Sequence, residues 1–195
     1  PMLTLNCTSG TIAPYLPEDE RPWNRQRLRH LHRRLGFGLS PQAINQQIDD
    51  NPLELVDQLL GEAQTAPPLP EPEWANWNVQ DYDDFQEEYP PQLIEWGKLA
   101  IRDMFDNSVR SKLVLFWSNH FVTKLQAYLC PSYLYRYHKV LETHALGNFK
   151  DFVHAIGTTP AMLVFLNGVQ NTRIEPNENY ARELYELFTL GRDNG

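Results

Sequence analysis

Two glutamates near the C-terminal end have the spacing of a carboxylate pair. Glu183 and Glu186 lie in a stretch with helical periodicity, so a helix would place them one turn apart on one face. Two carboxylates in that arrangement can bind a hard cation or act as a catalytic acid–base pair. The same stretch also has a structural interpretation, because Arg182 is within helical reach of both Glu178 and Glu186.

Two histidines could complete a metal site with these acids. If His120 and His144 met Glu183 and Glu186, the mixed imidazole and carboxylate ligands would suit a divalent zinc, manganese or iron ion. The competing interpretation is structural. His120 lies among aromatic residues, where a histidine is commonly a core residue hydrogen-bonded to a carbonyl. His144 lies near a helix end, where a cation favours the negative terminus.

The segment that ends at Arg33 and Arg34 is locally basic, and Gly36 and Gly38 follow it. These two arginines are candidates for contact with an anion or a partner, with backbone donors supplied by the glycines. However, the segment matches neither the phosphate-binding loop nor the dinucleotide-binding pattern. The alternative is that both arginines are solvated or pair with acids of the same chain, such as those of residues 71–88.

The length and amino-acid composition of the chain limit the class of protein to which it can belong. With 195 residues, of which 42% are hydrophobic, the chain suits one domain with a sizeable core. Its net charge of −8 argues against nucleic-acid binding. Cys7 and Cys130 form no disulfide framework, and two free thiols are favoured over one bridge. No apolar run has the length of a membrane span and no signal peptide is visible, so cytoplasmic and exported locations both stay open.

Apolar residues recur at helical spacing, punctuated by proline and glycine, and no stretch alternates with a period of two. This pattern predicts an all-α protein, an irregular multi-helix bundle. Residues 1–20 are expected to form an irregular arm and residues 21–195 a single helical domain. The last helix, residues 178–190, is predicted to face the core with Tyr180, Leu184, Leu187 and Phe188.

Residues 64–91 differ from the rest of the domain. They are rich in proline and acidic residues, contain no lysine or arginine, and carry several aromatic residues. This composition predicts an extended or partly disordered insertion. The aromatic side chains are expected to pin it to the helical body, with the helical pattern resuming at Leu93.

The segment Pro176–Gly191, PNENYARELYELFTLG, closely resembles the hallmark of a bacterial family, domain of unknown function 1800. Four further segments resemble its motifs in the same order: 32–38 (HRRLGFG), 116–121 (FWSNHF), 144–149 (HALGNF) and 159–163 (TPAML). The resemblance implies that the chain is the N-terminal part of a larger bacterial protein, with a C-terminal remainder beyond Gly195. It also implies that many relatives are exported. It transfers no established activity.

Two functional hypotheses follow. The favoured one is a helical scaffold or binding domain that contacts the C-terminal remainder or another protein. The alternative is part of a metal- or carboxylate-dependent hydrolase. The hydrolase requires Glu183, Glu186 and a histidine to line one cleft without arginine partners, whereas the scaffold predicts that a cation pairs with these acids. A missing remainder would also leave apolar residues exposed on the last helix or a neighbouring one.

Overall fold

The computed structural model describes residues 13–191, which form helices and contain no β-strand. The all-α prediction is therefore confirmed. Cys7, most of the predicted N-terminal arm and the end of the chain at 192–195 lie outside the described residues. The α-helices are α1 Arg25–Leu35, α2 Pro41–Gln47, α3 Pro52–Thr65, α4 Phe85–Asp106, α5 Ser108–His120, α6 Leu125–Tyr128, α7 Pro131–His144, α8 Phe149–Gly157, α9 Pro160–Phe165 and α10 Asn179–Glu183. Three short 3-10 helices are η1 Glu73–Asn76, η2 Val79–Asp81 and η3 Gly168–Gln170, and the π-helix η4 Leu184–Thr189 continues α10.

Side chains at the residue before the first turn cap several helices. The side chains of Ser40, Asn51, Asn148 and Thr159 each accept a hydrogen bond from a backbone N–H in the first turn that follows. Each bond satisfies a donor that has no partner within the helix. Local sequence therefore determines where α2, α3, α8 and α9 begin.

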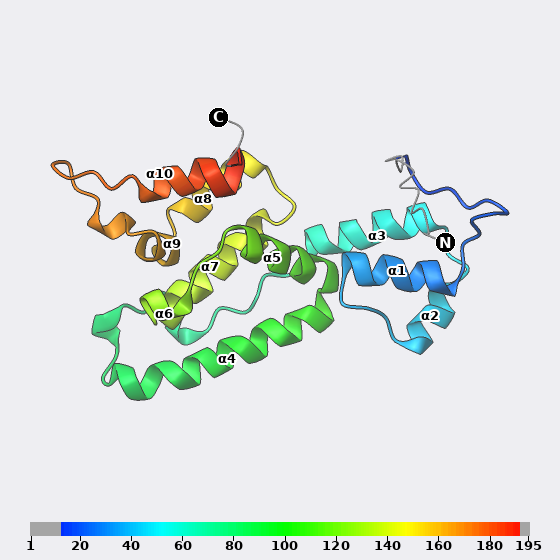
Figure 1. The fold of residues 1–195 in the computed structure, drawn as a ribbon. Coiled ribbons are helices and arrows are strands. Elements are labelled where there is room, and N and C mark those ends of the chain that lie inside the picture. Colours follow the sequence, from blue (N-terminus) through cyan, green and yellow to red (C-terminus); the bar gives the residue numbers. More distant parts are fainter. Residues whose placement is uncertain (1–12, 192–195) are drawn as a thin grey trace, which may run out of the picture.

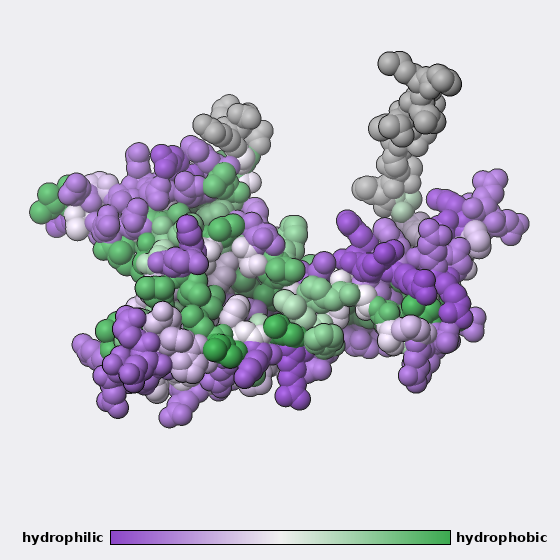
Figure 2. Space-filling model, turned by 60° about the horizontal axis from the view of Figure 1, so that its bottom comes forward, coloured by the Kyte–Doolittle hydropathy of each residue, from purple (hydrophilic) through white to green (hydrophobic). Residues whose placement is uncertain are grey.

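Helix α7 lies at the centre of the bundle, between α4 on one side and α8 and α9 on the other (Figure 1). Helix α5 packs beside α7 and also contacts α1 and α3. The largest hydrophobic cluster joins α5, α7, α8, α9 and the last helix around Phe121 and Phe152, which are 0% and 1% exposed. On the face shown in Figure 2, hydrophilic residues cover much of the periphery and hydrophobic residues gather toward the middle.

A second hydrophobic cluster holds α1, α2 and α3 together and includes Val109 of α5. At its junction with α5, the backbone N–H of Phe37 donates a hydrogen bond to the Ser108 hydroxyl at 3.1 Å. A Cβ atom at Gly36 would collide with that hydroxyl. The 32–38 segment therefore serves as the contact between α1 and the start of α5.

Residues 64–91 contain η1, η2 and the first turns of α4. Leu69 and Trp74 are buried against Tyr135 of α7, so an aromatic side chain does pin this segment to the body. The indole of Trp74 also donates a hydrogen bond of 2.7 Å to Glu95, and Glu71 pairs with Lys139 at 2.9 Å.

The start of α4 differs from the sequence prediction, because this helix begins at Phe85 and contains Pro90 and Pro91. The side chain of Asp84 accepts hydrogen bonds from two first-turn N–H groups, and the rings of Phe85 and Tyr89 stack at 5.0 Å. The cap and the stacked rings favour the helix over the breaks that two prolines normally cause.

Apolar residues keep helical spacing over residues 109–126, but the helix is interrupted at Phe121. Helix α5 ends at His120, and the Phe121 side chain turns into the core. The carbonyl of Phe121 accepts a hydrogen bond of 2.6 Å from the Tyr137 hydroxyl. Within residues 13–191, no helix combines the length and the apolar composition needed to cross a membrane.

Candidate functional site

The last helix packs on the body along one stripe. Tyr180 and Leu184 are partly buried in the main hydrophobic cluster, and Phe188 is 5% exposed. Leu187 was predicted to face the core as well, but it is 61% exposed, so that part of the prediction is wrong. From Leu184 onward the helix is a π-helix, whose wider turn rotates position 187 away from the core.

A glycine in α8 receives the ring of Tyr180. A Cβ atom at Gly157 would collide with the Tyr180 hydroxyl and the ring carbon that carries it. We expect Gly157→Ala to lower the free energy of unfolding by about 1–3 kcal/mol through overpacking. Urea unfolding measures this effect.

Two comparisons make this prediction specific to the Gly157–Tyr180 contact. Gly97→Ala, in a helix position with no atom near the added methyl group, should instead stabilise the protein by about 0.5–1 kcal/mol. In a Tyr180→Ala background the cost of Gly157→Ala should disappear, because neighbouring substitutions couple. An equal cost in both backgrounds would show that Tyr180 does not dock on Gly157.

The two candidate histidines have structural contacts. His120 Nε2 lies 2.9 Å from the carbonyl oxygen of Phe188, with the rings of Trp117 and Phe121 beside the imidazole. His144 stacks on Phe152 with a centroid separation of 5.5 Å. The hydrogen bond of His120 ties the end of α5 to the last helix, as the structural interpretation expects.

The structure does not bring the predicted metal ligands together. Across residues 13–191, no group of three or more His, Cys, Asp or Glu side chains is placed to hold a metal ion. The set of His120, His144, Glu183 and Glu186 is therefore not assembled in the described part of the chain. The binding of a divalent metal ion stays a prediction, and no ligand cluster within residues 13–191 supports it.

The two candidate catalytic acids differ in their partners. Glu183 is 21% exposed at its side chain and lies 3.7 Å from the Arg182 guanidinium. The predicted pairs of Arg182 with Glu178 and Glu186 are not formed, because its guanidinium instead donates a hydrogen bond of 2.9 Å to Asn179. Glu186 is half-buried and has no ion pair with any residue in the described range.

Arg33 and Arg34 are exposed near the end of α1 and make no ion pair within the described range. The expected pairing with acids of residues 71–88 is wrong for these two side chains. Glu71, one of those acids, pairs with Lys139 of α7 instead. The solvated alternative fits the geometry, and contact with an anion or a partner stays a prediction.

The most distinctive polar arrangement is one that the sequence did not reveal. We call it the buried ion cluster, and it consists of Asp103, Arg110, Ser111, His138 and Glu142. The Arg110 guanidinium lies 2.9 Å from an Asp103 oxygen and 3.4 Å from a Glu142 oxygen. The Ser111 hydroxyl donates a hydrogen bond to the carboxylate of Asp103.

The buried ion cluster also holds the chain that follows α3. Arg110 donates a hydrogen bond of 2.7 Å to the carbonyl of Ala66, and the backbone N–H of Leu69 lies 3.3 Å from both Glu142 oxygens. The cluster thus joins α4, α5, α7 and the segment after α3 through charged groups. Because hydrogen bonds to charged groups are strong when they are shielded from water, this junction should be rigid.

The charges within the buried ion cluster do not balance. The side chains of Arg110, Asp103 and Glu142 are 6%, 8% and 3% exposed, so two carboxylates share one buried guanidinium. Burial raises the pKa of Glu142, although nearby Arg110 opposes that shift. Burial lowers the pKa of His138 to about 4, although nearby Asp103 opposes that shift and Arg110 adds to it, so this imidazole is neutral at pH 7.

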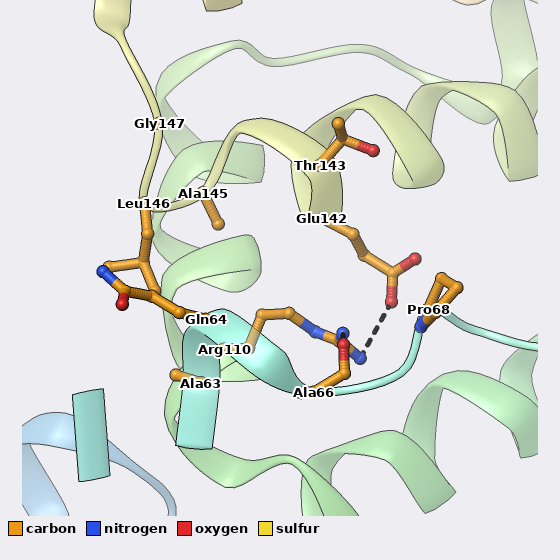
Figure 3. A pocket seen from close by; sticks show the side chains of 10 residues that line it. All are labelled: Ala63, Gln64, Ala66, Pro68, Arg110, Glu142, Thr143, Ala145, Leu146 and Gly147. Atoms are coloured by element: carbon orange, nitrogen blue, oxygen red, sulfur yellow. Dashed lines mark hydrogen bonds and ion pairs between the residues drawn. The ribbon is translucent and has the colours of Figure 1, made fainter. Parts of the chain in front are cut away.

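A cavity of about 310 Å³ opens beside the cluster (Figure 3). Arg110 and Glu142 point toward each other in its wall, while Gln64 and Leu146 lie at the other end (Figure 3). The Arg110 terminal nitrogens are already engaged by Asp103, Glu142 and Ala66. This wall is therefore suited to holding the helices together rather than to binding a charged ligand.

The family model described as "Protein of unknown function (DUF1800)" matches residues 30–195. The chain belongs to the DUF1800 family. No curated protein and no solved structure matches it.

Three of the motif segments of this DUF1800 domain meet in one aromatic core. Trp117, from the 116–121 segment, donates a hydrogen bond of 3.0 Å to Ala145 and packs at 5.8 Å against Phe149, both from the 144–149 segment. His120 then links the 116–121 segment to Phe188 of the last helix. In this DUF1800 domain these motifs therefore position helices relative to one another.

Proposed function

We propose that this domain is a helical scaffold that binds a second protein surface through its last helix. The observation that carries the proposal is exposed apolar side chains on this helix. Tyr185 and Leu187 are 59% and 61% exposed in the same helical segment as the buried residue Phe188. Large apolar side chains held in water at neighbouring positions are typical of protein interaction sites.

Two exposed aromatic rings lie on α5 and α8, which share the main hydrophobic cluster with the last helix. Phe116 and Phe149 are 59% and 42% exposed, and both rings contact Trp117. The ring of Phe149 also lies 6.3 Å from His120, which bonds to the last helix. The exposed aromatic rings and the last helix thus belong to one continuous aromatic region, which suits aromatic anchors of a protein interface.

Self-association of the purified chain tests this proposal. We expect light scattering to show a rise in mean mass with concentration, since a second copy can cover the exposed apolar side chains. Leu187→Glu should weaken that association by about tenfold or more, because it places a charge in the interface.

Ile94→Glu is the matched control, since Ile94 is similarly exposed, at 60%, but lies on α4. This variant should associate within about twofold of the unmodified chain. A strictly monomeric chain at all concentrations, or equal association of both variants, would contradict the proposal.

The hydrolase alternative remains a prediction. It needs Glu183, Glu186 and a histidine in one cleft, whereas His120 and His144 are engaged with Phe188 and Phe152. Elemental analysis of the untagged protein tests whether it binds a metal ion. A stoichiometric divalent ion, with a loss of thermal stability in chelator, would favour the hydrolase over the scaffold.

A further inference from the structure

A second cavity, of about 340 Å³, lies between α4, α5, α6 and α7. Most of its wall is apolar, formed by Trp96, Ala100, Met104, Val114, Leu115, Leu125, Leu134, Tyr137 and Leu141. Asp103, Ser111 and His138 of the buried ion cluster form part of the same wall. A cavity of this size with mostly apolar walls and few polar groups has the character of a small-molecule site.

The charge of the buried ion cluster selects among ligands. Asp103 and Glu142 together carry one more negative charge than Arg110 can balance when both acids are ionised. An anionic group brought beside Asp103 would meet this excess in a poorly solvated site, where repulsion is strong. A neutral or cationic group would not be repelled by this excess negative charge.

His138 lies in the wall at the same end of the cavity as Asp103 and Ser111. Its imidazole is 14% exposed, and Nε2 is buried without a hydrogen-bond partner. The nearest Glu142 oxygen is 3.9 Å away, which is too far for a hydrogen bond. The carboxylate of Asp103 and the hydroxyl oxygen of Ser111 are acceptors in the same part of the wall, so a ligand group that donates a hydrogen bond there is favoured.

We propose that this cavity binds a small, largely apolar molecule that ends in an amine or a hydroxyl group. The apolar part occupies the space between Trp96, Val114 and Leu134, and the polar end lies toward Asp103, Ser111 and His138. This inference does not depend on the proposed scaffold function, because it uses a different surface of the domain.

A displacement assay tests the site. The purified chain is titrated with N-phenyl-1-naphthylamine, whose fluorescence rises in apolar surroundings, and the dye is then displaced by 4-phenylbutylamine, 4-phenylbutanol or 4-phenylbutyrate. We expect saturable binding of one dye per chain. The amine and the alcohol should displace the dye at a concentration about tenfold or more below that of the carboxylate, a difference set by the head group alone.

A cavity-filling variant locates the binding. Ala100→Phe places a ring in the cavity and should weaken dye binding about tenfold or more. Ile101→Phe is the control, because Ile101 is the next residue of α4 and is 58% exposed. It should bind the dye like the unmodified chain. Leu134→Trp fills the same cavity from α7 and replaces Ala100→Phe if circular dichroism shows that the latter is unfolded.

Three results would overturn this proposal. They are the absence of saturable dye binding by the unmodified chain, displacement by the carboxylate as effective as by the amine and the alcohol, and unchanged binding in a folded cavity-filling variant. If neither cavity-filling variant folds, the comparison of the three head groups on the unmodified chain is the test of the proposal.

Discussion

Arg110→Met should lower the free energy of unfolding by about 3–5 kcal/mol at pH 7, the range for removing one partner of a buried ion pair. The substitution retains an apolar stem of comparable length but leaves Asp103 and Glu142 buried without their shared cation. It also leaves the Ala66 carbonyl without its 2.7 Å hydrogen bond. Urea unfolding followed by circular dichroism measures the loss.

Arg102→Met provides the matched control. The Arg102 side chain is 81% exposed and lies 3.7 Å from Asp106, so its loss should change stability by less than about 1 kcal/mol. Adding Glu142→Gln to Arg110→Met should recover part of the stability, because it removes one of the two uncompensated charges. Equal effects of Arg110→Met and Arg102→Met would show that the buried ion cluster does not hold α4, α5 and α7 together.

The second large effect is loss of stability in mild acid through His138. Its pKa is about 4 in the fold, against 6.5 as the reference value, so the fold binds its proton more weakly than the unfolded chain. The stability that His138 contributes is complete above pH 6.5 and is lost as the pH falls toward 4. The shift corresponds to about 3 kcal/mol over this range.

His138→Leu should therefore flatten the dependence of unfolding free energy on pH between 6.5 and 4. The same substitution at His30, whose ring is exposed, is the control and should leave the pH profile close to that of the unmodified chain. Glu142 acts in the opposite direction, because its raised pKa favours the fold as the acid becomes protonated. His32, whose pKa is lowered by burial, adds to the acid effect of His138. Identical pH profiles for His138→Leu and the unmodified chain would contradict this account.

Local signals in the sequence predicted the helical framework well. The caps at Ser40, Asn51 and Asn148 act within one turn, so their effect is visible without knowledge of the fold. The structural interpretation of His120 also agrees with its hydrogen bond to Phe188, because aromatic neighbours indicate a core position.

Features set by distant contacts were harder to predict. Prolines such as Pro90 and Pro91 normally end a helix, and α4 includes them where the Asp84 cap and the stacked rings of Phe85 and Tyr89 support its first turns. Leu187 was assigned to the core from α-helical spacing, which the π-helix changes.

The buried ion cluster was missed for a different reason. Asp103, Arg110 and Glu142 are charged residues on three helices, and such residues are most often found at the surface. Helix α5 also contains Lys112 and several uncharged polar residues, so no local signal singles out Arg110. Sequence spacing does not show that the three side chains meet.

The contact made by the last helix is tested most directly by photo-crosslinking. A benzoylphenylalanine residue is placed at position 187 on η4 or at position 94 on α4, which are similarly exposed in the unmodified chain at 61% and 60%. If the last helix binds a second protein surface, irradiation of the purified chain should yield a covalent dimer from position 187 and little from position 94. Crosslinking from position 94 alone, or from neither position at concentrations where the chain associates, would contradict the scaffold proposal.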